Sequence, residues 1–195
     1  MTLGTSAVAT GLAFIFTGAI SVAIMDIPFL DLFYSVKVLG LPIPLILAAV
    51  AFGLTLATLS RTRFGRELYA LGANPEAARL SGVPVVQRKI AVFAIMGLLV
   101  GLGAVLSAAR LGSGAPGSAP ALTLDAIAAV IIGGASLFGG RASVLRTLLG
   151  ALLIAVLNNG MVLMNVNVDA QYVVKGVIIL IAVVLERLAS RGRLT

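Results

Sequence analysis

Residues 90–109 read IAVFAIMGLLVGLGAVLSAA, a stretch of apolar and small residues without any charged side chain. A helix of about 20 residues is about 30 Å long, which equals the thickness of the hydrocarbon core of a bilayer. The stretch therefore predicts a helix that crosses a membrane. Gly97 and Gly101 lie at GxxxG spacing within it and predict the close approach of a neighbouring helix.

Five more stretches have a similar composition, and a transmembrane helix needs about 17 to 25 mainly apolar residues. They are residues 3–20, 43–59, 122–138, 145–164 and 172–185. The 122–138 stretch is short, and the pairs Gly133-Gly134 and Gly139-Gly140 interrupt it. It is therefore open whether this segment crosses fully or is re-entrant. We expect an all-α fold, a single polytopic transmembrane helical bundle over residues 1–195 with about six membrane-crossing segments.

The overall composition excludes a soluble fold. Of the 195 residues, 60% are hydrophobic and 11% are charged, and the mean hydropathy is +1.14. In soluble domains about a quarter of the residues are charged. The chain has no Cys, His or Trp, which excludes disulfides, thiolate or imidazole metal sites and Ser-His-Asp triads. We expect no metal site and no catalytic residue in this chain.

The positive charges predict the orientation of the chain. The net charge is +7, but the basic residues flank apolar stretches instead of forming a stripe, so nucleic acid is not an expected partner. With six spans, one side receives the basic residues of 61–89, Arg141, Arg146 and the tail after residue 186, while the other side receives only Lys37, Arg110 and Lys175. The positive-inside rule then places both termini in the cytoplasm.

The longest polar stretch, residues 61–89, contains the signals of a short helix. Asn74 can cap its amino terminus, Pro75 suits the first helical position, and Glu76 favours the positive end of the helix dipole. Gly82 can end the helix, and Pro84 follows it. The pattern predicts a helix of about two turns over residues 75–81.

This short helix needs a packing partner. Isolated helices shorter than about 12 residues are marginal in water, so its small apolar surface must be covered either by the bundle itself or by another protein. That surface is predicted to consist of Ala77, Ala78 and Leu80.

The sequence around the helix, ALGANPEAARLSGV at residues 70–83, resembles the cytoplasmic coupling loop of bacterial monosaccharide ABC permeases. The resemblance extends upstream to TRFGR at 62–66 and downstream to LDAIAAVIIGGASLFGGR at 124–141, LNNG at 157–160 and VKG at 174–176. It covers nearly the whole chain, which looks like the carboxyl-terminal half of a permease of the ribose and xylose importer family.

The resemblance implies a set of partners. In this family two permease copies form the pathway as a homodimer, an ABC ATP-binding subunit hydrolyses ATP, and a periplasmic or extracellular sugar-binding protein delivers the sugar. The coupling helix docks in a groove of the ATP-binding subunit, which implies an interface of Asn74, Pro75, Glu76, Ala77, Ala78, Arg79, Leu80, Ser81 and Gly82. The alternative is that residues 61–89 pack only on the bundle or on anionic lipid headgroups.

The length of the chain departs from the family pattern. Family members are considerably longer and have an amino-terminal half with a related Gly-rich segment. Residues 1–36 also contain no Lys or Arg that would anchor a first span. We therefore expect a fragment, a split permease or a shortened reading frame.

Polar groups inside the predicted spans are few. Asp125 and Lys175 lie near predicted span ends, so no charge is expected at mid-depth, where a proton- or sodium-coupled carrier would need one. Asn158 and Asn159 lie midway along 145–164, where a carboxamide needs hydrogen-bond partners in protein or in a wet cavity. The candidate translocation path consists of Asn158, Asn159, Gly133, Gly134 and Ser136. The alternative roles are an interhelical hydrogen bond for the Asn residues and a helix break for the Gly pair.

The energy for transport is expected to come from another chain. The sequence has no GxxxxGK[ST] motif for ATP binding, and Asp26 and Asp31 in a predicted external loop do not indicate a glycosidase. We expect a transport subunit that is not an enzyme and has no cofactor of its own, because ATP is bound by the partner subunit.

The sequence predicts a permease subunit of an ATP-driven monosaccharide importer, with pentoses as the first candidates. Its expected location is the inner or plasma membrane of a prokaryote, in contact with lipid. Two alternatives stay open. One is a permease for branched-chain amino acids or another small solute, and the other is a truncated membrane assembly protein that does not transport.

Overall fold

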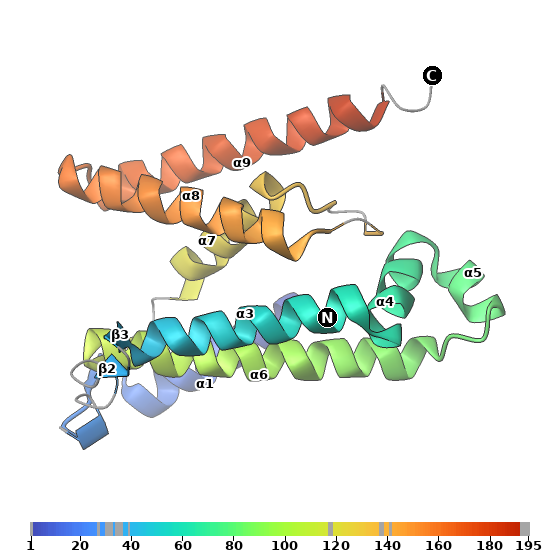
Figure 1. Ribbon diagram of the computed structural model, residues 1–195. Helices are drawn as coiled ribbons and strands as arrows, with labels where there is room; N and C mark the ends of the chain where they lie inside the picture. The colour runs from blue at the N-terminus through green and yellow to red at the C-terminus, as the bar shows by residue number, and fades with distance from the viewer. Residues whose placement is uncertain are drawn as a thin grey trace. The chain divides into compact units, whose positions relative to one another are not determined.

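The computed structural model describes residues 2–26, 28–29, 33, 37–38, 40–116, 119–136, 139–140 and 142–191. Figure 1 shows the helices of this part of the chain, which are α1 (Thr2–Thr17), α3 (Ile43–Arg61), α4 (Arg63–Ala73), α5 (Pro75–Leu80), α6 (Val85–Leu111), α7 (Ala119–Ile132), α8 (Val144–Leu163) and α9 (Val168–Arg191). Each predicted apolar stretch overlaps a helix, and α4 and α5 form within residues 61–89. The predicted all-α class is confirmed.

Two pairs of very short antiparallel strands lie between the helices. β1 (Val22–Ala23) pairs with β4 (Ser113–Gly114), so that Val22 is opposite Gly114. β2 (Lys37–Val38) pairs with β3 (Leu41–Pro42), so that Lys37 is opposite Pro42. The sequence did not predict these strands, because two residues are too few to show an alternating pattern.

Three of the described helices, α3, α6 and α8, are long and apolar enough to cross a membrane. Two further apolar helical segments, Gly4–Thr17 and Ala121–Ile132, are shorter. The six predicted helices therefore form, although those at 3–20 and 122–138 are shorter than a full span requires.

α7 ends well before the predicted end at residue 138. Its 14 residues give a helix about 21 Å long, which is less than the hydrocarbon thickness of about 30 Å. Gly134 has φ +73°, its N–H donates to the carbonyl of Ile131 at 2.8 Å, and the N–H of Ala135 donates to that of Val130 at 3.2 Å. This is a Schellman stop, which needs glycine in the left-handed region. The predicted break at Gly133-Gly134 is confirmed, whereas Leu137 and Phe138 lie outside the described residues.

The chain divides into two compact units, of which the first contains Met1–Leu54 and Ile90–Ala119. Among its described residues only Ala109 is buried. A Cβ added to Gly97 or Gly101 would meet no atom within 4 Å. The close approach predicted from the GxxxG spacing is therefore not made among the described residues of the chain, and this face of α6 is open.

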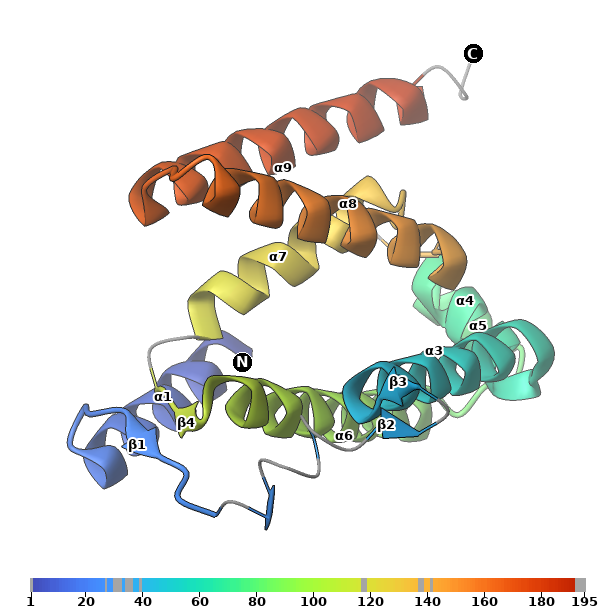
Figure 2. The same cartoon turned by 60° about the vertical axis from the view of Figure 1, so that its left-hand side comes forward.

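The second unit contains Thr55–Lys89 and Pro120–Thr195. Figures 1 and 2 show α8 and α9 running side by side, with α7 against α8. Its core is formed by the buried Ala128, Ala129 and Ile154, against which Ile132, Leu157 and Ile179 pack. These contacts join α7, α8 and α9 into one three-helix group.

Glycines bring α7 and α8 into backbone contact. A Cβ added to Gly133 would lie 2.6 Å from the Cα of Thr147, and one added to Gly150 would overlap the carbonyl oxygen of Ala129. Small residues permit this approach because they remove the side chain that would hold the backbones apart. The two helices are therefore in contact at two points where no larger residue can be accommodated without movement.

Candidate functional site

The polar loop, which we define as residues 61–89, begins with a sharp turn between α3 and α4. Thr62 caps α4, since its Oγ1 accepts a hydrogen bond from the N–H of Gly65 at 3.2 Å and donates one to the carbonyl of Thr58 at 2.6 Å. A Cβ on Gly65 would overlap the backbone of Leu59. The turn therefore requires glycine at position 65, and it fixes the direction in which α4 leaves α3.

α5 forms as the sequence predicts. Asn74 Oδ1 accepts hydrogen bonds from the N–H groups of Glu76 at 3.0 Å and Ala77 at 3.1 Å, and Pro75 occupies the first turn. At the other end Gly82 has φ +81°, and the N–H of Val83 donates to the carbonyl of Ala78 at 3.0 Å. The helix ends at Leu80, one residue earlier than predicted, because Ser81 is its C-cap.

The apolar residues of α5 point in two directions. Leu80 is 82% exposed and Ala77 is exposed, whereas Ala78 is only 4% exposed. Of the predicted apolar surface of Ala77, Ala78 and Leu80, the chain itself covers only Ala78, and a helix of six residues needs such a packed face to be stable. Ala78 holds α5 in place, and Leu80 remains available to another molecule.

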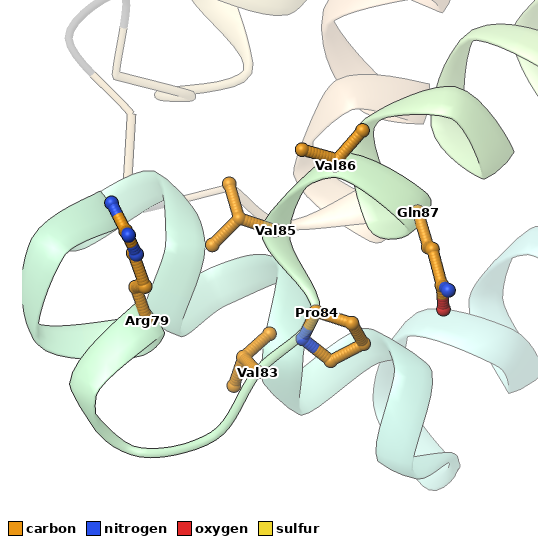
Figure 3. A pocket seen from close by; sticks show the side chains of 6 residues that line it. All are labelled: Arg79, Val83, Pro84, Val85, Val86 and Gln87. Carbon is orange, nitrogen blue, oxygen red and sulfur yellow. The ribbon is translucent and has the colours of Figure 1, made fainter.

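A shallow depression lies beside the end of α5. Figure 3 shows its lining residues, which come from α5, the following turn and the start of α6 and are Arg79, Val83, Pro84, Val85, Val86 and Gln87. Its volume is about 590 Å³. Apart from the Arg79 guanidinium and the Gln87 amide, these side chains are apolar, so the depression suits an apolar group with a polar edge.

The base of the polar loop is closed by contacts between α4 and α6. The Arg88 Nε donates a hydrogen bond to Glu67 Oε2 and forms an ion pair with it. The guanidinium of Arg88 also lies 5.5 Å from the ring centroid of Phe64, a distance typical of a cation–π contact. Both side chains of the ion pair are about one-third to one-quarter exposed, at 32% and 26%, so this pair contributes about 1 kcal/mol at most.

α4 also contacts the segment that follows α7. A Cβ on Gly72 would lie 2.7 Å from the backbone nitrogen of Gly140, and one on Gly139 would lie 2.5 Å from the carbonyl oxygen of Gly72. The Tyr69 hydroxyl donates a hydrogen bond to the carbonyl of Ala142 at 3.1 Å. The polar loop and the connection between α7 and α8 are thus in backbone contact.

A polar cluster lies among α7, α8 and α9, and we define it as Asp125, Asn158 and Lys175. Lys175 Nζ lies 2.7 Å from Asp125 Oδ1, and Asn158 Nδ2 donates to Asp125 Oδ2 at 2.9 Å. The side chains of Lys175 and Asp125 are 10% and 23% exposed. α7 and α9 begin earlier than the predicted apolar stretches, so both residues lie within helices, and their position near span ends stays a prediction.

The charges of the cluster are compensated. Asp125 Oδ1 makes no hydrogen bond of regular geometry among the described residues, but an ammonium group 2.7 Å away makes it electrostatically paired. Removing one member of a buried ion pair costs roughly 3–5 kcal/mol, because the other charge is left without a partner. The pair is therefore a strong constraint on the positions of α7 and α9.

The sequence profile of a family described as "Branched-chain amino acid transport system / permease component" matches residues 1–183. The chain belongs to this permease family. Its membership of this family makes it a protein of the bacterial inner membrane. No solved structure matches it.

The permease is similar to several sugar permeases. The ribose import permease protein of Bacillus subtilis is 45% identical over 152 residues, which are 78% of this chain and 47% of that protein. The xylose transport system permease protein of Escherichia coli is 47% identical over 154 residues, covering 78% of this chain and 39% of that protein. The L-arabinose transport system permease protein of Escherichia coli is 39% identical over 197 residues, covering 100% of this chain and 59% of that protein. The resemblance to monosaccharide permeases is confirmed, and the chain spans between 39% and 59% of the length of these relatives.

Of the residues predicted to line the translocation path, some pack against other helices and others are exposed. Gly133 is buried against α8, and Asn158 makes an interhelical hydrogen bond. Asn159 and Gly134 are exposed, and Ser136 is half-buried. Asn158 Oδ1 is buried without a hydrogen-bond partner among the described residues. The structure therefore gives Asn158 the interhelical role that the sequence left as an alternative, and the role of the five residues in a path stays a prediction.

Sequence reasoning missed the pairing of Asp125 with Lys175. The signal that could have found it is their opposite charge, since an acidic and a basic residue in apolar helices of one bundle need each other as partners. It also missed the contact of Gly72 with Gly139 and Gly140, for which the only signal is the presence of glycine in both segments.

Proposed function

We propose that the chain is the transmembrane permease subunit of an ATP-driven importer for monosaccharides, with pentoses as the first candidates. The support is its identity of 39–47% to permeases named for ribose, xylose and L-arabinose. The description of the family names branched-chain amino acids, which remain the alternative solute. The relatives favour sugars, because a family profile is coarser than a pairwise match of this extent.

The proposal that α5 couples the permease to ATP hydrolysis rests on how this helix is capped and packed. Its cap, its glycine stop and the buried Ala78 hold it firmly, although it is only six residues long. Leu80 is 82% exposed and directly follows Arg79, which lines the apolar depression. Exposed apolar side chains next to a concave apolar surface are typical of a docking site. We assign this surface to the ATP-binding subunit, with Asn74, Pro75, Glu76, Ala77, Arg79, Leu80, Ser81 and Gly82 as its contacts.

The contacts of α4 supply a route by which motion at α5 reaches the helix bundle. α5 follows α4 after the single residue Asn74, and α4 touches Gly139 and Gly140 through its backbone. Close-packed backbone contacts transmit displacement because neither side can yield. A movement of the polar loop driven by ATP is therefore expected to displace the connection between α7 and α8.

The orientation and the remaining partners belong to the same proposal. The polar loop faces the cytoplasm, where the ATP-binding subunit is found, and both termini lie on that side, as the distribution of Arg and Lys favours. A second permease copy, a sugar-binding protein and lipid complete the assembly. The exposed apolar side chains of α3, α6 and α8 suit lipid or another apolar helix.

Co-purification tests the coupling surface. A pentose-type ATP-binding subunit is expressed with the permease, and the ratio of the two proteins is measured after purification in detergent. Leu80→Ser is expected to lower the amount of bound subunit about tenfold, the effect of losing roughly 1.4 kcal/mol of binding free energy. Ala70→Ser, at an exposed position of α4, is the matched control and should leave the ratio unchanged. Equal recovery with both variants would contradict the assignment of α5 to this partner.

Uptake tests the solute. Cells that lack their own pentose permeases are supplied with the complete importer, and the entry of labelled ribose, xylose, L-arabinose and leucine is compared. We expect uptake of at least one pentose and none of leucine. Leucine uptake alone would support the alternative solute, and binding of the ATP-binding subunit without any uptake would support an assembly role.

A further inference from the structure

We propose that Asp125, Asn158 and Lys175 are positioning residues that form a clasp, and that the clasp keeps α7, α8 and α9 together as one rigid body while the permease works. The clasp itself follows from the geometry of the three side chains. The statement about movement rests on the proposed transport function, so the two are tested by separate measurements.

The backbones of α7 and α8 are in direct contact. The Cβ positions of Gly133 and Gly150 are occupied by the backbone of the opposite helix. Sliding one helix along the other would move neighbouring larger residues into these two points. α7 and α8 are therefore fixed to each other by shape alone.

α9 contributes no residue to these backbone contacts. Its links to α7 and α8 include the apolar side chain of Ile179, which packs against the core, and the ammonium group of Lys175. Apolar contacts restrain helix sliding weakly in lipid, because lipid tails are as apolar as the side chains. The ion pair is specific in position, since a shift of one helical turn, about 5.4 Å, would separate the charges.

Asn158 in α8 binds the other oxygen of the Asp125 carboxylate. Its Nδ2 donates to the Asp125 oxygen that does not face Lys175. A carboxylate can only accept, so the amide must present its nitrogen to Asp125. Each helix thus provides one member of the cluster, and Asp125 in α7 is held from both sides. A device built only to join two helices would not need the third residue.

The two ion pairs of the described part of the chain differ in their exposure to water. The Glu67–Arg88 ion pair is 26% and 32% exposed, so water can replace either partner when it opens. Lys175 and Asp125 are 10% and 23% exposed, and opening that pair would leave charges in an apolar environment. The partly exposed pair suits a part that moves, and the cluster suits a part that stays closed.

A first experiment tests the clasp in detergent, without any transport. The apparent melting midpoint is measured for Asp125→Asn, Lys175→Met and the two combined. Each single change is expected to lower the midpoint by about 6–20 °C because it leaves an unpaired buried charge. The combined variant should lose less than the sum of the single losses, because no charge remains. Asn158→Ala should also lower the midpoint, and Asn159→Ala, at the exposed neighbour, is the matched control.

The outcomes of this experiment decide whether the clasp exists. Additive losses, or equal losses for Asn158→Ala and Asn159→Ala, would overturn it. If a single variant does not accumulate in membranes, the reversed pair Asp125→Lys with Lys175→Asp replaces it. If the reversed pair gives stable protein, the clasp is supported. If neither the reversed pair nor the combined neutral variant gives stable protein, the clasp is contradicted.

A second experiment tests whether the clasp stays closed. The sequence contains no cysteine, so Asp125→Cys with Lys175→Cys can be joined by a short bis-methanethiosulfonate reagent in the complete importer. We expect the cross-linked permease to import sugar at least as fast as the same protein after reduction, because the covalent link replaces the ion pair. Single-cysteine variants treated with the reagent are the controls. Loss of uptake on cross-linking that is reversed by reduction would show that the clasp opens, which would overturn the rigid-body proposal.

The two experiments separate the failure of this inference from the failure of the proposed function. If the unmodified importer takes up no sugar, the transport proposal fails, and the melting midpoints still decide whether the clasp exists. If uptake is normal and the midpoints of the single and combined variants are additive, the clasp fails while transport stands.

Discussion

Replacement of Gly133 by alanine tests the packing of α7 on α8 most directly. The added Cβ would lie 2.6 Å from the Cα of Thr147, 2.8 Å from its nitrogen and 2.9 Å from the carbonyl carbon of Arg146. All three neighbours are backbone atoms of one segment, so no side chain can rotate away. α8 must therefore shift by several tenths of an ångström or more, and overpacking of this kind costs about 1–3 kcal/mol.

The expected consequence is a measurable loss of thermal stability. For a protein of this size, 1 kcal/mol corresponds to roughly 2–4 °C in melting midpoint. Gly133→Ala should therefore lower the apparent midpoint in detergent by about 2–12 °C. The assay heats the purified permease in steps and measures by size-exclusion chromatography how much folded protein remains.

Gly97→Ala is the matched control, because the chemical change is the same and the surroundings are open. A Cβ at Gly97 would meet no atom within 4 Å, and Gly within a helix is less favourable than Ala by about 0.5–1 kcal/mol. The control should therefore raise the midpoint by about 1–4 °C. A melting midpoint for Gly133→Ala that is no lower than that for Gly97→Ala would refute the contact between α7 and α8. A clear drop in melting midpoint for Gly97→Ala alone would indicate that another helix covers this face of α6.

Three further changes test the polar loop. Asn74→Ala removes the cap of α5 and should destabilise this helix by about 1 kcal/mol. Trypsin is expected to cleave the polar loop faster in this variant, whereas Asn74→Asp should be cleaved at the original rate. Tyr69→Phe removes the hydrogen bond to the Ala142 carbonyl and should cost about 1 kcal/mol, which calorimetry or stepwise heating would detect as a drop of about 2–4 °C; an unchanged midpoint would contradict this link. Glu67→Gln should lower the midpoint only slightly, because its ion pair with Arg88 is partly exposed, and the difference from the unmodified permease should vanish in high salt; a large loss that salt does not reduce would contradict this estimate.

Local signals account for the parts of the structure that the sequence predicted well. The helices follow the apolar stretches because, in lipid, every backbone polar group must be satisfied within the segment itself. α5 follows from Asn74, Pro75 and Gly82, whose preferences for the cap, the first turn and the left-handed stop act over only a few residues. The break after α7 follows in the same way from Gly134.

The faces and contacts of these elements depended on residues far apart in the chain. Ala78 is buried although its neighbours Ala77 and Leu80 are exposed, and composition cannot tell which face of a six-residue helix turns inward. The Gly97 and Gly101 pair suggested a close contact that the described part of the chain does not make. Spacing alone shows that a close approach is possible, and a neighbouring backbone decides whether it occurs.

The amino-acid sequence by itself determined that this is a helical membrane protein, where its helices lie and how α5 is capped, because apolar length and capping are properties of short segments. Only the tertiary structure decided that Asp125 pairs with Lys175. Hydropathy placed each charge near the end of an apolar stretch, but α7 begins at Ala119 and α9 at Val168, so both charges lie inside helices. An ion pair between distant segments depends on which helix faces reach the same point, and that is decided by packing.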